Sequence, residues 1–134
     1  MSSEPLPIVQ GTLDILVLKA LTDTPLHGYA VARWIRETTD DALQIEEGAL
    51  YTSLHRLEKR GWLASKWGLS ENKRRAKFYV ATSEGLKRLE KESQAWSRYA
   101  EAVFKVLDAP VVRARSGKSF SEAGTGAPDP EAVT

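Results

Sequence analysis

The amino-terminal part of the chain is dominated by apolar side chains at helical spacing. From Thr12 onward they recur every three or four residues, as in an amphipathic helix, at Leu13, Leu16, Val17, Ala20 and Leu21. Ile15 and Leu18 make the opposite side of this segment apolar as well. A helix that is apolar on every side is buried on every side. We therefore expect it to contact both its own core and a second chain.

A second and a third helix are predicted after short breaks. Pro25 and Gly28 interrupt the first pattern, and helical spacing resumes over residues 28–38. The third helix spans residues 47–60, and Gly61 follows at the place where a left-handed glycine commonly closes a helix. The expected inner faces are Val31, Trp34 and Ile35 in the second helix, and Leu50, Leu54 and Leu57 in the third.

Two short segments with strand character come next. Residues 62–67 alternate roughly between apolar and polar side chains, and residues 76–81 are rich in aromatic and β-branched ones. A polar turn separates the two segments. This order predicts a β-hairpin whose tip holds the basic residues Lys73, Arg74, Arg75 and Lys77.

A long helix with a heptad pattern is predicted after the hairpin. Thr82 is a suitable N-cap, and seven later positions keep the alternating three- and four-residue spacing of a coiled-coil seam. The helix would be roughly 35–40 Å long, too long for a domain of this size to cover. We expect two copies to pair through this helix and the first one, with an interface made of Leu13, Val17, Leu86, Leu89, Ser93, Trp96, Ala100, Val103 and Leu107.

The order of these elements predicts a mainly α fold with a small β-hairpin, that is, a winged helix-turn-helix. In such a fold the third helix enters the major groove of DNA, and the hairpin tip reaches neighbouring phosphates. We expect residues 11–81 to form this domain and residues 82–109 to form the dimerisation helix. Residues 1–10 are interpreted as a loose leader. Residues 110–134, which are rich in Gly, Ser, Ala and Pro, are interpreted as a flexible tail.

The charge distribution supports a nucleic-acid partner. The net charge of the 134 residues is only +1, but residues 51–91 hold eleven bases and four acids, a net charge of +7. A localised basic segment is typical of a protein that binds a polyanion. On the third helix, the side chains outward of or flanking the leucine stripe are candidates for contacts with base edges or phosphates: Ala49, Thr52, Ser53 and Arg56.

The composition argues against several classes of function. The chain has no cysteine, which excludes disulfides and thiolate chemistry and fits a reducing, cytoplasmic location. No stretch approaches the roughly 18 apolar residues of a membrane span, and we recognise no signal peptide. His27 and His55 lack companion ligands, and no catalytic or phosphate-binding motif is found. We therefore predict no metal site, no cofactor and no enzymatic activity.

Three stretches in this order resemble the PadR family of transcriptional regulators: LHGYAVARWI, GALYTSLHRLEKRGWL and RRAKFYVATSEGLKRL. The single C-terminal helix is similar to that of the smaller PadR subfamily. The resemblance implies a homodimer that represses genes at a palindromic operator and, in some members, releases DNA when a small molecule binds. By position it implies DNA contacts from Tyr29, Ala49, Tyr51, Thr52, Ser53, Arg56, Lys73, Arg74, Arg75 and Lys77. For Tyr51, packing into the core is an open alternative.

Trp96 has two interpretations. In drug-sensing PadR relatives, a tryptophan at the matching place pairs with its twin across the dimer and holds flat aromatic compounds. The resemblance thus implies an effector pocket lined by Trp96, Ser93, Ala100, Leu13 and Val17. Alternatively, Trp96 is simply a large residue of the dimer interface, where aromatic side chains are favoured. For the whole chain, the alternative function is a protein-interaction module whose heptad helix binds a partner helix without DNA.

Overall fold

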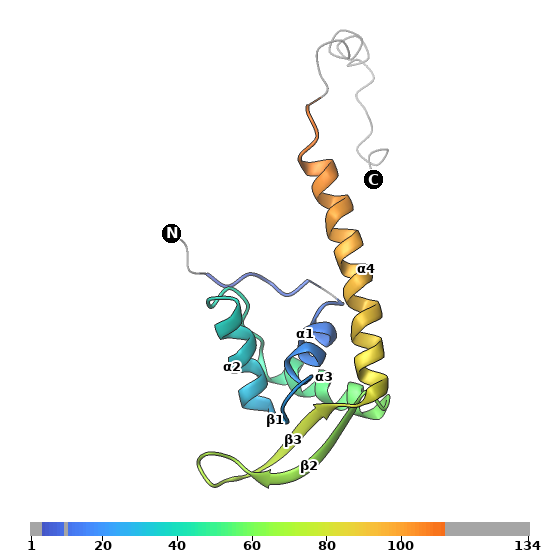
Figure 1. Ribbon diagram of the computed structural model, residues 1–134. Coiled ribbons are helices and arrows are strands. Elements are labelled where there is room, and N and C mark those ends of the chain that lie inside the picture. The colour runs from blue at the N-terminus through green and yellow to red at the C-terminus, as the bar shows by residue number, and fades with distance from the viewer. Residues whose placement is uncertain (1–3, 10, 112–134) are drawn as a thin grey trace. The chain divides into compact units, whose positions relative to one another are not determined.

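The computed structural model describes residues 4–9 and 11–111 of the chain. Its helices are α1 (Leu13–Ala20), α2 (Gly28–Thr38), α3 (Glu47–Lys59) and α4 (Ser83–Leu107), and its strands are β1 (Leu26–His27), β2 (Leu63–Leu69) and β3 (Arg75–Ala81) (Figure 1). The chain divides after Ser97 into two units, so α4 begins in the first and continues into the second. The predicted flexible tail, residues 110–134, lies outside the described residues from residue 112 onward.

The predicted mainly helical fold, with a winged hairpin and a long C-terminal helix, is confirmed, and the sheet has one strand more than expected. β3 lies between β1 and β2 and is antiparallel to both. β1 consists of two residues, with Leu26 opposite Tyr79 and His27 opposite Phe78. A strand this short has no alternating pattern, so hydrophobic periodicity does not reveal it.

The apolar core of the first unit joins α1, α2 and α3 to the sheet and to the start of α4. Its buried side chains are Val17, Leu18, Leu21, Val31, Ile35, Leu50, Leu54, Leu57, Leu63, Tyr79 and Leu89. The predicted inner stripe of the third helix is confirmed, because Leu50, Leu54 and Leu57 are at most 2 % exposed. Trp34 differs from the prediction, since 38 % of its surface remains exposed at the edge of the core.

This core corrects part of the predicted dimer interface. Val17 is fully buried within the single chain, and Leu89 is only 9 % exposed, so neither offers surface to a second copy. Leu13 also packs against the core and is only partly exposed. The physical reason is that α2 and α3 both contact α1 and cover most of its apolar surface. The apolar pattern of α1 is therefore explained largely by its own chain.

Thr82 and Gly85 fix the start of α4 against the end of α3. The Thr82 hydroxyl donates to the Gly61 carbonyl at 2.7 Å and accepts a hydrogen bond from the Gly85 amide at 3.0 Å, which confirms the predicted N-cap. Gly85 lies so close to the Trp62 carbonyl that an added Cβ would clash with it. Gly61 has a φ of +82°, the left-handed conformation predicted for the end of this helix. These contacts hold the turn at Gly61, before the hairpin, next to the turn at Thr82, after it.

The prediction of a loose leader is wrong at Leu6. This residue forms an isolated parallel bridge with Leu43, in the connector between α2 and α3. Its amide donates to the Ala42 carbonyl at 2.8 Å. Backbone groups in an irregular connector need hydrogen-bond partners, and an extended neighbouring segment supplies them. The amino-terminal segment therefore forms a backbone hydrogen bond with the connector between α2 and α3.

Candidate nucleic-acid interface

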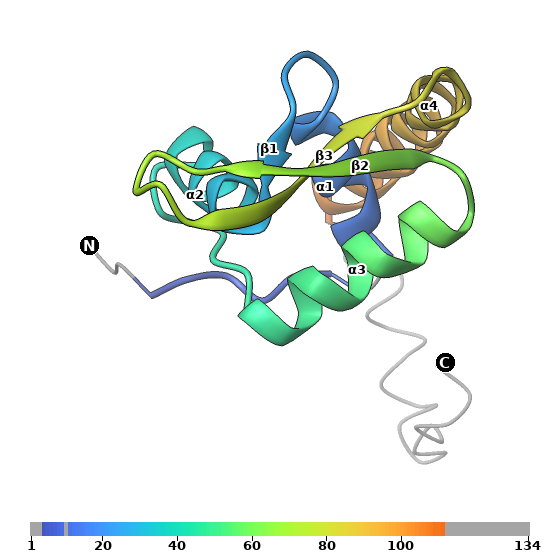
Figure 2. The same ribbon diagram turned by 90° about the horizontal axis from the view of Figure 1, so that it is seen from below.

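A hollow of about 850 Å³ lies between α2, α3 and the β2–β3 hairpin, which we call the wing. Figure 2 shows these three elements together on the underside of the first unit. We call this space the wing hollow, and its lining residues are His27, Gly28, Tyr29, Arg33, Tyr51, Trp67, Ser70, Glu71, Asn72, Arg74, Arg75, Ala76, Lys77 and Tyr79. Four of them are Lys or Arg and one is acidic, so the hollow favours an anion.

The helices contribute exposed side chains beside this hollow. Tyr29 at the start of α2 is 63 % exposed, and Ala49 and Thr52 on α3 are exposed as well. Tyr51 is 44 % exposed, and a Cβ added at Gly28 would lie only 2.5 Å from its hydroxyl oxygen. Its ring therefore crosses the backbone of α2 and does not enter the core. This close approach explains why a glycine stands between His27 and Tyr29.

The prediction that Ser53 contacts DNA is wrong, and the role of Arg56 is corrected with it. Ser53 is fully buried, and its hydroxyl donates to Asp14 Oδ1 of α1 at 2.6 Å. Arg56 donates to the same carboxylate from Nη2 at 2.6 Å and from Nε at 3.1 Å. We call these three residues the Asp14 clamp. It joins α3 to α1 by directional bonds, and it engages the arginine that helical position and the family resemblance both assigned to DNA.

The clamp keeps the Asp14 carboxylate ionised. Burial opposes ionisation, but hydrogen bonds from Arg56 and Ser53 outweigh it and hold the pKa of Asp14 below its ordinary value of 3.8. The side chains of Asp14 and Arg56 are 25 % and 39 % exposed, so solvent screens the pair only in part.

Lys77, which was also predicted to contact DNA, has an acidic partner within its own chain. Its amino group donates to Glu58 Oε1 at 3.2 Å, and the Ser65 hydroxyl donates to the other oxygen of that carboxylate at 2.6 Å. The hydrogen bond from Ser65, followed by the one from Lys77, holds the pKa of Glu58 below its usual range. Lys77 thus connects β3 to α3, and its charge is neutralised within the chain.

The remaining basic residues of the wing are exposed. Lys73, Arg74 and Arg75 all have exposed side chains, and the Arg75 guanidinium lies 4.6 Å from the centre of the Trp67 ring. The Ser70 backbone closes the turn, donating to the Arg74 carbonyl at 2.9 Å and accepting from the Lys73 amide at 2.8 Å. The wing therefore presents three cations at a defined turn.

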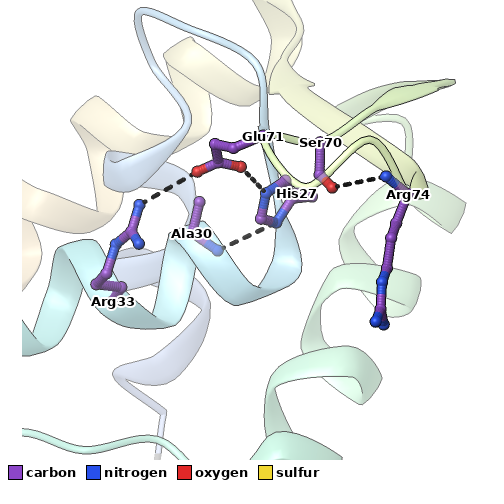
Figure 3. Close-up of polar contacts among 6 residues, drawn as sticks. All are labelled: His27, Ala30, Arg33, Ser70, Glu71 and Arg74. Carbon is purple, nitrogen blue, oxygen red and sulfur yellow. Dashed lines mark hydrogen bonds and ion pairs between the residues drawn. The ribbon is translucent and has the colours of Figure 1, made fainter.

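A further group links the wing to α2 and was missed by sequence reasoning (Figure 3). Glu71 approaches His27 Nε2 at 3.3 Å with one carboxylate oxygen and Arg33 Nη2 at 3.6 Å with the other. A hydrogen bond from its own backbone, followed by the one with His27, lowers the pKa of Glu71. No periodic pattern in the sequence connects Glu71 with His27, which lies 44 residues away.

Comparison with known families decides the class of this protein. A model described as the transcriptional regulator PadR-like family matches residues 17–91, more than half of the chain, including α3 and the whole wing. The chain belongs to the PadR-like family of transcriptional regulators. Membership implies DNA binding, and because the family is not enzymatic, the prediction that the chain is not an enzyme is confirmed.

Solved structures and a sequence relative are similar to this chain over most of their length. The crystal structure of a PadR family transcriptional regulator from Eggerthella lenta is 36 % identical, with a TM-score of 0.63, over 75 % of this chain and 86 % of that one. A transcriptional regulator from Clostridium thermocellum is 32 % identical, with a TM-score of 0.65, over 72 % and 93 %. A protein named uncharacterized protein X from Lysinibacillus sphaericus is 28 % identical over 72 % of this chain and 88 % of its own length.

The described part of this PadR-like regulator shows neither a metal-binding cluster nor a membrane-spanning helix. Across residues 4–9 and 11–111, no three His, Cys, Asp or Glu side chains are grouped so that they could hold a metal ion. None of the helices described is long and apolar enough to cross a membrane.

Trp96 lines an apolar hollow of about 240 Å³, and none of its neighbours there was predicted. The other lining residues are Leu6, Pro7, Ile8, Val9, Thr12, Leu16 and Leu43. The predicted lining residues Leu13, Ser93 and Ala100 do not line this hollow, and the inclusion of Val17 in a pocket is wrong because Val17 is fully buried in the core. Four of the residues that line this hollow, Leu6 to Val9, belong to the amino-terminal segment that pairs with Leu43. The heptad pattern of α4 carries no information about that segment.

The Asp14 clamp predicts a loss of stability in Asp14→Asn. The neutral amide cannot form the charged hydrogen bonds to Arg56, so we expect the free energy of unfolding to fall by roughly 1–3 kcal/mol. Urea denaturation measures this value, and Asp23→Asn, at an exposed acid, is the matched control. An equal effect of the two substitutions would contradict the clamp.

The same pair of proteins gives a pH test with a defined sign. Because the folded-state pKa of Asp14 lies below 3.8, its stabilising contribution is fully present above that value and is lost as the pH falls through the folded-state pKa. The stability difference between wild type and Asp14→Asn should therefore be constant near neutral pH and shrink below pH 3.8. A difference that grows on acidification would contradict this assignment.

Proposed function

We propose that this PadR-like regulator binds double-stranded DNA with sequence specificity as a homodimer and represses transcription from a palindromic operator. The observation that carries the proposal is the wing hollow, where the exposed bases of the wing lie beside the exposed ends of α2 and α3. Because operator DNA lies in the cytoplasm of a bacterial cell, the proposal places the protein there.

The elements have different tasks in this proposal. Ala49 and Thr52 are short side chains on the exposed side of α3, so they permit close approach to base edges in the major groove. Tyr29 and Tyr51 offer hydroxyl groups to the phosphate backbone at the flank of the groove. Lys73, Arg74 and Arg75 neutralise phosphates and supply affinity without sequence information.

Dimerisation is proposed through the outer part of the heptad seam. Two leucines of the seam remain exposed in the single chain, Leu86 at 43 % and Leu107 at 69 %, and beside seam positions Tyr99 is 65 % and Phe104 is 60 % exposed. Apolar surface of this kind on a helix with heptad spacing favours a second identical helix. Val17 and Leu89 are excluded from the interface because they are buried. The proposed contacts on α4 are therefore Leu86, Ser93, Trp96, Ala100, Val103 and Leu107.

We also propose that a flat aromatic compound, bound at Trp96, releases the DNA. The apolar hollow beside Trp96 supports this, and a ligand there would contact both α1 and α4. In a dimer that reads half-sites about 34 Å apart, a shift of a few ångströms between the two α3 helices removes contacts.

The wing predicts a sequence-independent loss of affinity in the double variant Arg74→Ala/Arg75→Ala. Two lost phosphate contacts should reduce the log–log slope of affinity against salt by about 1.8, at every duplex sequence tested. Fluorescence anisotropy with a labelled duplex measures both quantities. Thr52→Ala is the comparison, because it should change sequence preference and leave the slope unaltered. If wild type binds no duplex even at low salt, the interaction module is the better explanation.

The proposed seam predicts that Val103→Glu produces monomers. A charge buried between two copies costs roughly 2 kcal/mol or more, so dimer dissociation should become at least about tenfold easier. Sedimentation velocity at micromolar concentration distinguishes dimer from monomer. Ala102→Glu introduces the same charge at the exposed neighbouring residue and should leave the dimer intact. Monomeric wild-type protein would contradict the proposal.

The apolar hollow predicts that a planar dye such as acridine quenches tryptophan fluorescence through Trp96. Titration of wild type should saturate, and Trp96→Ala should abolish the saturable response. Trp67→Ala removes an exposed tryptophan outside this hollow and should retain the response. An unchanged titration in Trp96→Ala would rule out the pocket.

A further inference from the structure

An acidic residue lies in the turn of the basic wing. Glu71 precedes Lys73, Arg74 and Arg75, and its side chain is 64 % exposed. A carboxylate on a loop that faces phosphates opposes DNA binding, because like charges repel. Its position among the exposed bases therefore requires a physical explanation.

The carboxylate is directed away from those bases and toward α2. Figure 3 shows Glu71 between His27 and Arg33, while the Arg74 side chain extends in another direction. One oxygen lies 3.3 Å from His27 Nε2, and the other lies 3.6 Å from Arg33 Nη2. An anion with two oxygens is thus held by two nitrogens, one from the N-cap residue of α2 and one from within that helix.

The two nitrogens belong to a preformed arrangement. His27 Nδ1 accepts the Ala30 amide at 3.3 Å, so the proton of a neutral ring lies on Nε2, which donates toward the carboxylate. The ring also contacts Phe78 edge-on at a centroid distance of 5.3 Å, and its side chain is only 12 % exposed. Arg33 lies against the Tyr29 ring, 5.5 Å from its centre. His27 is therefore held by contacts that do not involve the carboxylate, and Arg33 has one such contact, with the Tyr29 ring.

We propose that His27 and Arg33 form a site for a backbone phosphate of DNA, and that Glu71 occupies this site until DNA displaces it. A phosphate presents two anionic oxygens as a carboxylate does, and it meets the same two donors. The site opens into the wing hollow beside Tyr29 and Arg74, where the proposed DNA backbone passes. The inference rests on the proposed DNA-binding function and adds a competition between the protein's own carboxylate and its ligand.

Two roles of Glu71, displacement by DNA and permanent attachment of the wing to α2, predict opposite effects of Glu71→Gln on duplex affinity. If Glu71 leaves when DNA binds, Glu71→Gln removes a competitor and tightens binding. If Glu71 instead holds the wing in place throughout, Glu71→Gln loosens the wing and weakens binding. Exposed ion pairs of this kind are weak, so we expect duplex affinity to rise about two- to fivefold in Glu71→Gln.

A double-mutant cycle separates displacement from the general removal of negative charge. Duplex affinity is measured for wild type, E71Q, R33Q and the double variant, with Asp23→Asn as the control for net charge. Displacement predicts that R33Q weakens binding about two- to fivefold more in the E71Q background than in wild type, because only there is Arg33 free of its competitor. Additive effects, an E71Q effect no larger than that of Asp23→Asn, or weaker binding by E71Q would each overturn the proposal.

The His27 ring gives a second readout that identifies the source of the phosphate. In E71Q, stoichiometric duplex should shift the ring proton resonances of His27. If only millimolar inorganic phosphate shifts them and the duplex does not, the assignment to the DNA backbone is overturned. Wild-type protein that binds no duplex would instead overturn the proposed function itself, so the two failures are distinguishable.

Discussion

The arrangement of the proposed DNA-facing side depends on one carboxylate. The leucine stripe of α3 buries one side of that helix, but apolar contacts are non-directional and fix its rotation only loosely. Asp14 adds three hydrogen bonds, one from Ser53 and two from Arg56, and all three act along defined directions. The clamp thereby sets which residues of α3 face outward. In this orientation of the helix, Ala49 and Thr52 are exposed.

The clamp also changes how the positive charge is distributed. Arg56 is neutralised by Asp14, and Lys77 is neutralised by Glu58, so two bases of the cationic segment stabilise the fold. Among the exposed bases of this segment, Lys73, Arg74 and Arg75 are consecutive and lie in the wing. The proposed division of labour follows directly: short side chains on α3 read the groove, and the wing supplies electrostatic affinity.

The outline of the fold was predictable because it depends on spacing along the chain. The leucine stripe of α3, the Thr82 cap and the left-handed Gly61 are local features, and all three were confirmed. The partners of polar groups are not local. Asp14 lies 39 residues from Ser53, and Glu71 lies 44 residues from His27, so no periodic pattern connects them. For that reason helical position predicted Ser53 as outward-facing, and the structure showed it to be buried.

The most direct test of this account observes the Arg56 side chain in the DNA complex. The Nε–Hε resonance of Arg56, assigned by its loss in Arg56→Lys, reports the hydrogen bond to Asp14 in solution. Our account predicts that this resonance stays unchanged when duplex DNA is added, while the backbone amides of Thr52 and Arg74 shift. A large shift of the Arg56 resonance on DNA binding would show that the guanidinium leaves Asp14 for the DNA, and the clamp would not be the element that orients α3.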